Sequence, residues 1–130
     1  MRWTRLVIGG AAVLTLAGCG ASADTKAVPP TATGSLESLA AEARCTPKMQ
    51  TDTDEIRQAL CRNGDGRFVL ATFATDRGQR EWLDDAEDYG GCYLVGRKWV
   101  AVGDDGTVRA LRGRLGGDVE RGADHHAHGG

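Results

Sequence analysis

The spacing of apolar and polar positions predicts a helix early in the chain. Apolar side chains recur after Ser35, a good N-cap, at the spacing of one helical face. They are Leu36, Leu39, Ala40 and Ala43. This helix should end near residues 45–47, because the residue before a proline avoids the helical region. We expect residues 49–54 to form an irregular loop.

A β-hairpin is predicted next. Residues 55–62 and 67–74 are the two candidate strands, and the second is rich in β-prone side chains. Between them, Asn63-Gly64-Asp65-Gly66 favours a tight turn, because Asn-Gly and Asp-Gly tolerate positive φ.

The second half of the chain repeats this order. The predicted elements are a helix over residues 76–89, strands over 92–95 and 98–102, and a helix over 107–115. Asp76 and Gln79 have capping-box spacing at the start of the first of these helices, and Gly90 would end it. Gly96-Arg97 would join the two strands, with glycine first as in type II′ turns. Residues 104–106 would form a turn and cap the last helix.

The element order α-β-β-α-β-β-α predicts one small α+β domain over residues 35–115. Its helices should pack on one face of a mainly antiparallel sheet. Residues 19–34 are rich in Ala, Ser, Thr, Gly and Pro, which is typical of a flexible linker. Residues 116–130 are rich in Gly, Asp and His, so we expect a disordered tail.

The beginning of the chain has the order of a secretory signal. Residues 1–5 are short and cationic, residues 6–16 are apolar, and small residues follow. The apolar run is too short to span a bilayer. Leu16-Ala17-Gly18-Cys19 resembles the lipobox of bacterial lipoproteins. The resemblance implies removal of signal peptide 1–18 and a lipidated Cys19 that holds the chain at the extracytoplasmic face of the cell membrane. An ordinary signal peptide with an incidental Cys19 is the alternative.

The charge of the chain weighs against nucleic acid as a partner. There are 16 Lys and Arg residues against 18 Asp and Glu, and removing the signal takes away Arg2 and Arg5, which leaves a net charge of −4. A mildly acidic module gains nothing from phosphates. Anionic lipid headgroups would not attract it either, so the acyl chains would hold it at the membrane.

Several separated features of the domain occur together in one known pattern. They are a helix ending in Cys45, a strand ending in Cys61, the segment 71–74 (ATFA), Trp82, and the segment 90–100 (GGCYLVGRKWV). Over about residues 36–103 the chain resembles small uncharacterised lipoproteins of high-GC Gram-positive bacteria. That pattern has no assigned activity, so the resemblance implies fold and location only.

The remaining cysteines should be oxidised in an exported protein. Cys45, Cys61 and Cys92 allow three pairings, each of which leaves one thiol over. We favour Cys45–Cys61, which would join the end of the first helix to the end of the first strand. The resemblance implies the same pairing, because position 92 is not a required cysteine in that pattern. Cys92 would then be a small buried side chain, with intermolecular pairing as the alternative. A redox-active pair is disfavoured, because no Cys-x-x-Cys is present.

The only histidines form a cluster near the end of the chain. His125, His126 and His128 could bind Zn²⁺, Ni²⁺ or Cu²⁺, and we expect weak adventitious binding rather than a structured site. With no histidine inside the domain, a Ser-His-Asp or Cys-His arrangement is disfavoured.

Two further groups of residues have both a structural and a functional interpretation. Acidic residues gather near the end of the second helix, and we favour an ordinary solvated face over a site for calcium or a basic partner. They are Asp84, Asp85, Glu87 and Asp88. Trp82, Tyr93 and Trp99 should pack in the core rather than line a binding groove.

We therefore expect a lipid-anchored extracytoplasmic module without catalytic activity or cofactor, which binds an envelope protein or a small ligand. One alternative is a cell-envelope hydrolase, which would need a carboxylate pair such as Asp84 with Asp104. The other is a metal-handling lipoprotein that uses the three histidines.

Overall fold

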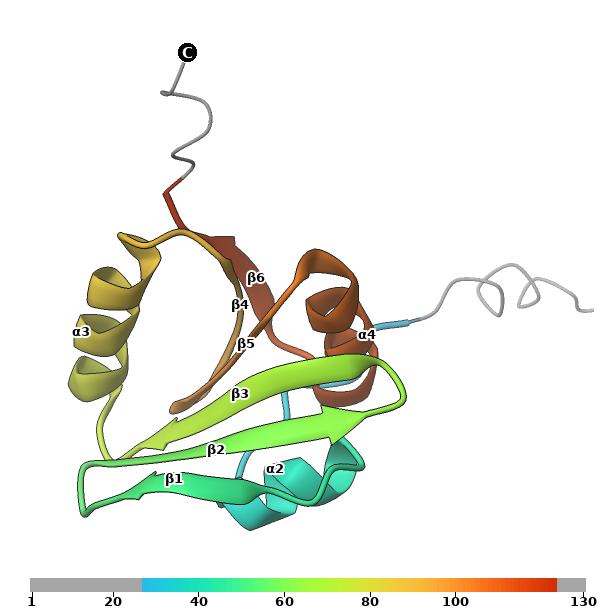
Figure 1. Ribbon diagram of the computed structural model, residues 1–130, viewed down its shortest axis with the longest axis horizontal. Coiled ribbons are helices and arrows are strands. Elements are labelled where there is room, and N and C mark those ends of the chain that lie inside the picture. The colour runs from blue at the N-terminus through green and yellow to red at the C-terminus, as the bar shows by residue number, and fades with distance from the viewer. Residues whose placement is uncertain (1–26, 124–130) are drawn as a thin grey trace, which may run out of the picture.

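The computed structural model describes residues 27–123 and shows a small α+β domain (Figure 1). Its elements, in chain order, are α2 (Leu36–Glu42), β1 (Lys48–Asp52), β2 (Ile56–Asn63), β3 (Gly66–Phe73), α3 (Asp76–Glu87), β4 (Cys92–Gly96), β5 (Trp99–Gly103), α4 (Asp105–Leu115) and β6 (Asp118–Arg121). The expected fold class is confirmed. Among these helices, none is long and apolar enough to cross a membrane.

All six strands belong to one open sheet in the order β1-β2-β3-β5-β4-β6, and every neighbouring pair is antiparallel. The hairpin between β2 and β3 closes at the pair Asn63 and Gly66, where the turn is predicted. Helix α3 connects β3 to β4, and α4 connects β5 to β6. Each of these two helices therefore joins two strands that run in the same direction and have one other strand between them.

The helices cover both faces of the sheet. In Figure 1, α3 lies on one side of β4 and β5, and α4 lies on the other. Phe68 and Leu70 of β3 belong to the core under α2 and α4, whereas Ala71 and Phe73 belong to the core under α3. The expectation that the helices share one face is wrong, because the central strands carry apolar side chains on both faces.

Trp99 fills the middle of the larger core and ties the start of the described chain to it. This residue is fully buried, and its Nε1 donates a hydrogen bond of 2.7 Å to the Ala32 carbonyl. The Ala32 amide in turn donates to the Leu115 carbonyl at 2.7 Å. The expectation of a flexible linker up to residue 34 is therefore wrong at Ala32, which is docked on the domain.

The other two aromatic residues in question also pack as predicted. Tyr93 is buried, and Trp82 packs against Phe73 with ring centroids 5.7 Å apart. Burial of the Tyr93 ring raises the pKa of its hydroxyl, which donates to the Ala86 and Gly90 carbonyls. The interpretation of these aromatics as core residues is confirmed.

Both edge strands are found where the sequence predicts none. Strand β1 occupies most of the expected loop, and β6 lies within the expected disordered tail. Both are short, polar and mostly exposed, so neither carries a hydrophobic alternation that would mark it. The disorder expected for residues 116–130 is thus wrong for Asp118–Arg121, and residues 124–130 lie outside the described part of the chain.

The turn between β4 and β5 lies one residue later than expected. Gly96 and Trp99 pair across the strands, so Arg97 and Lys98 form the loop, and Lys98 takes the positive φ of 62°. Gln79 holds this turn: its amide nitrogen donates to the Gly96 and Trp99 carbonyls, and its oxygen accepts from the Lys98 amide. The predicted capping-box role of Gln79 is therefore wrong.

Caps at the helix N-termini explain where the helices begin. Ser35 accepts from the Ser38 amide as predicted, and Thr75 rather than Asp76 caps α3. Asp104 caps α4, which begins at Asp105, two residues before its predicted start.

Gly96→Ala should destabilise the domain, because a Cβ at this position would overlap the indole ring of Trp99. Overpacking of this kind costs about 1–3 kcal/mol. Gly113→Ala is the matched control, because nothing lies within 4 Å of a Cβ there. Gly113 lies in the last turn of α4, where that change should stabilise by up to about 0.5–1 kcal/mol. Urea titration of both variants measures the two effects, and equal midpoints would contradict the packing described for Trp99.

Candidate functional site

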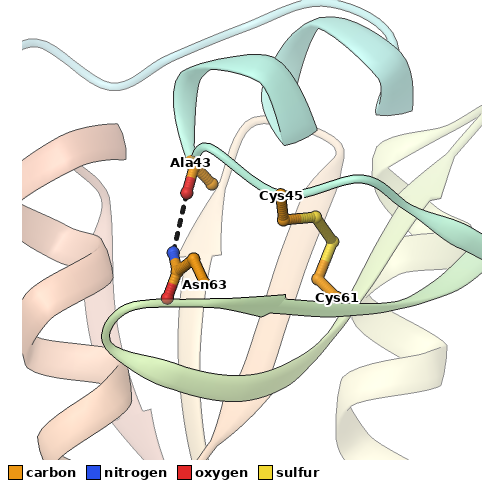
Figure 2. The surroundings of a disulfide bond; sticks show 4 residues. All are labelled: Ala43, Cys45, Cys61 and Asn63. Atoms are coloured by element: carbon orange, nitrogen blue, oxygen red, sulfur yellow. Dashed lines mark hydrogen bonds between the residues drawn. A yellow bond between two sulfur atoms is a disulfide. The ribbon is translucent and has the colours of Figure 1, made fainter.

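The predicted disulfide between Cys45 and Cys61 is present, with the Cα atoms 5.6 Å apart. It joins the segment that follows α2 to strand β2 (Figure 2). A hydrogen bond lies beside the disulfide. Asn63, two residues after Cys61, donates from its side-chain amide to the carbonyl of Ala43, two residues before Cys45, at 2.7 Å. Because Cys61 is buried beneath α2, this bond is structural rather than an exposed redox centre.

An ion-pair group holds the other end of α2. The Arg57 guanidinium donates two hydrogen bonds of 2.8 Å to the Glu37 carboxylate, and its Nε donates to Asp52 at 2.9 Å. These hydrogen bonds lower the pKa of Glu37 to about 2. Helix α2 is thus attached to the β1–β2 hairpin at both ends, covalently at one and ionically at the other.

Cys92 is a free, buried cysteine on β4. Burial of the thiol raises its pKa, and the neighbouring Asp105 carboxylate raises it further. A thiol with a raised pKa is a poor nucleophile at neutral pH. The interpretation of Cys92 as a small buried side chain is confirmed, and a residue only 5% exposed is poorly placed for pairing with another molecule.

The carboxylates considered for a hydrolase are not brought together. Asp84 lies on α3 and accepts from Arg80 Nε at 3.2 Å. Asp104 lies at the start of α4, on the opposite face of the sheet, and accepts from the Thr107 amide at 2.8 Å. The hydrogen bond from the Thr107 amide lowers the pKa of Asp104. Each carboxylate has a structural partner of its own.

A different carboxyl pair joins α3 to β6. Burial raises the pKa of Glu87 to about 7, and the adjacent Glu120 carboxylate adds to this shift. Arg80 donates to Glu120 at 3.0 Å and lowers the pKa of that carboxyl. One buried oxygen of Glu87 has no hydrogen-bond partner among the described residues, an environment that disfavours the ionised form and agrees with the raised pKa.

The pair does not follow from the sequence, because nothing there predicts β6. The expectation that the acidic end of α3 is one solvated face is wrong at Glu87. The structure divides that face, since Glu87 is half-buried while Asp84 and Asp85 are exposed. No sequence signal links Glu87 to Glu120.

Among residues 27–123, no three His, Cys, Asp or Glu side chains lie close enough to hold a metal ion. Residues 63–66 form the predicted hairpin turn. Asn63 accepts from the Asp65 amide at 2.7 Å, and the Asp65 carboxylate accepts from Arg114 at 3.0 Å. His125, His126 and His128 lie outside the described residues.

Comparison of the chain with protein-family models, with curated proteins and with solved structures finds no significant match.

Cys45→Ser should lower the free energy of unfolding by about 3 kcal/mol, because the bond closes a loop in the unfolded chain. Denaturant titration with and without reductant measures this. Reductant should destabilise the wild-type protein by a similar amount and leave Cys45→Ser unchanged. Cys92→Ala is the control and should stay sensitive to reductant. A wild-type protein indifferent to reductant would contradict the role given to this bond.

Glu87→Gln should flatten the dependence of stability on pH. A folded-state pKa of about 7, above the ordinary 4.5, means that this group contributes most at acid pH and that its contribution is lost as pH rises through about 7. Glutamine keeps a donor toward Glu120 and does not ionise. The variant should therefore be more stable than wild type at alkaline pH, by about 1 kcal/mol.

Thermal unfolding between acid and alkaline pH checks this expectation. Glu81→Gln is the control, because Glu81 lies on the same helix in an exposed pair with Arg77. It should keep the wild-type pH profile. If Glu87→Gln also keeps that profile, the pKa of Glu87 is not raised in the folded state.

Proposed function

We propose that this chain is a bacterial lipoprotein, anchored through lipid on Cys19 at the extracytoplasmic face of the cell membrane, where it acts as a non-enzymatic binding module. The observation that carries the proposal is the sequence Leu16-Ala17-Gly18-Cys19 directly after a cationic start and an apolar run. Signal peptide 1–18 would be removed, and the acyl chains would hold the mature chain at the membrane.

The covalent structure of the domain supports export. Disulfides persist in oxidising compartments and are rare where glutathione and thioredoxin keep thiols reduced. The buried bond between Cys45 and Cys61 fits a protein that folds outside the cytoplasm.

The state of the reactive groups supports binding rather than catalysis. In the described part of the chain, the Cys92 thiol is buried with a raised pKa, and Asp104 caps a helix. The Glu87 carboxyl is engaged with Glu120 beneath Arg80. These groups are used to hold elements together, and general acid–base catalysis would need them to face a substrate.

Cys19→Ala should abolish incorporation of labelled palmitate in cells that express the full chain. It should also move the protein out of the detergent phase on phase separation, or leave it unprocessed with its signal peptide attached. Cys92→Ala is the control, because it removes a cysteine that lies outside the motif, and it should label as wild type does. Unchanged labelling and partitioning of Cys19→Ala would contradict the proposal.

A further inference from the structure

Three cationic side chains at one end of the sheet lack partners. Lys48 of β1, Arg62 of β2 and Arg67 of β3 are exposed and make no side-chain hydrogen bond or ion pair with any residue between 27 and 123. Elsewhere in the domain, arginines such as Arg57 and Arg80 are bound to carboxylates. Within residues 27–123, no carboxylate is paired with any of the three side chains.

The strand register places these cations on one face. Arg62 lies directly opposite Arg67, and Lys48 lies directly opposite Leu60, which is two residues from Arg62. Like charges directly opposite each other in a sheet are destabilising, so the fold itself gains nothing from Arg62 and Arg67. An anionic partner would turn this repulsion into attraction.

No helix covers this part of the sheet. Helix α3 packs on the same face, but against Ala71 and Phe73 at the other end of β3. Leu60 is 45% exposed, and Val69, its partner on β3, is half-buried. We call this surface the open face; it consists of Lys48, Leu60, Arg62, Arg67 and Val69.

The chain enters the domain at this same end. Ala27, the first described residue, lines a surface hollow together with Asp65, which lies in the turn between Arg62 and Arg67. In Figure 1 the segment that begins at residue 27 lies beside α4, close to the β2–β3 turn. Ala27 lies only eight positions after Cys19 in the sequence. An extended chain of that length spans at most about 29 Å.

Carboxylates near the open face are already engaged. Asp65 accepts from Arg114, and Asp104, which shares a surface hollow with Arg62 and Arg67, accepts from the Thr107 amide. At the far end of the sheet, by contrast, Arg97 and Lys98 share their cleft with the exposed Asp54 and Glu55. Among the described residues that line that surface hollow, Arg62 and Arg67 therefore outnumber the one carboxylate without a cationic partner, Asp104.

We propose that the open face docks onto anionic phospholipid headgroups of the membrane to which the chain is anchored. This inference rests on the proposed lipid anchor, which would hold this end of the domain near the bilayer. Cationic side chains are attracted within a Debye length of an anionic surface, and half-exposed Leu60 and Val69 would contact the headgroup layer. The net negative charge of the chain would favour the orientation in which the other surfaces face away.

Two lysines allow the orientation to be measured. Lys48 lies on the open face, and Lys98 lies at the opposite end of the sheet. The full lipidated protein, purified from membranes, is reconstituted into vesicles of phosphatidylcholine alone or mixed with phosphatidylglycerol. A water-soluble acylating reagent is added, and mass spectrometry gives the rate at which each lysine is modified.

Lys48 should react several-fold more slowly on the phosphatidylglycerol vesicles than on phosphatidylcholine, whereas Lys98 should react equally on both. Salt of about 1 M, which shortens the Debye length to about 3 Å, should remove the difference. The double change Arg62→Gln and Arg67→Gln should also remove it. Arg77→Gln with Arg97→Gln is the matched control, because it removes the same charge elsewhere, and it should keep the difference.

Equal rates at Lys48 on the two kinds of vesicle would overturn the proposal while leaving the lipid anchor intact. Equal slowing of acylation at Lys48 and Lys98 on phosphatidylglycerol vesicles would also overturn it, because the membrane would then not bind the open face in preference to the opposite end of the sheet. Protection of Lys48 by soluble polyglutamate but not by phosphatidylglycerol would assign the face to an acidic macromolecule instead. A protein that floats with neither kind of vesicle would contradict the anchor itself, and the docking inference would fall with it.

Discussion

The attachment of α2 to β2 is the constraint on which the rest of the domain depends. A helix of seven residues is too short to be stable alone in water. It persists here because a disulfide and the Asn63–Ala43 hydrogen bond hold one end, while Arg57 binds Glu37 near the other. With α2 in place, Leu36 and Leu39 are fully buried in the core that also contains Trp99 and α4. Losing the attachment would expose that core from one side.

The same attachment makes the β2–β3 hairpin rigid at its turn. Asn63 links this turn to α2, and the Asp65 carbonyl accepts from the Thr107 hydroxyl at 3.0 Å. The Asp65 carboxylate, bound to Arg114, ties the turn to α4 a second time. Arg62 and Arg67 flank this fixed turn, so their repulsion cannot be relieved by separating the strands. Their charge is therefore held in one place on the surface, as a docking face requires.

Elements with periodically spaced apolar side chains could be predicted from the sequence, and elements without them could not. The helices and the four central strands have apolar side chains at helical or strand spacing, and the predicted elements match them to within a few residues. Strands β1 and β6 have almost none, since both lie at sheet edges and are fixed by backbone pairing and by charges far away in the sequence. Glu120 of β6, for example, is held by Arg80, forty residues earlier. Without β6 the raised pKa of Glu87 could not be predicted, because burial of this carboxyl and its contact with Glu120 both raise it.

The net charge of the chain likewise says little about where charged side chains lie on the surface. The net charge of the chain gives no reason to expect attraction to anionic lipid, and the sequence analysis drew that conclusion. The structure shows why the net charge misleads, because carboxylates such as Glu37, Asp65 and Glu120 are each paired with an arginine of the domain. Lys48, Arg62 and Arg67 are left over at one end, and strand register, which the sequence alone did not supply, brings them together. What this domain offers a partner there is a fixed set of charges around Leu60, and such a surface supports binding more readily than it supports chemistry.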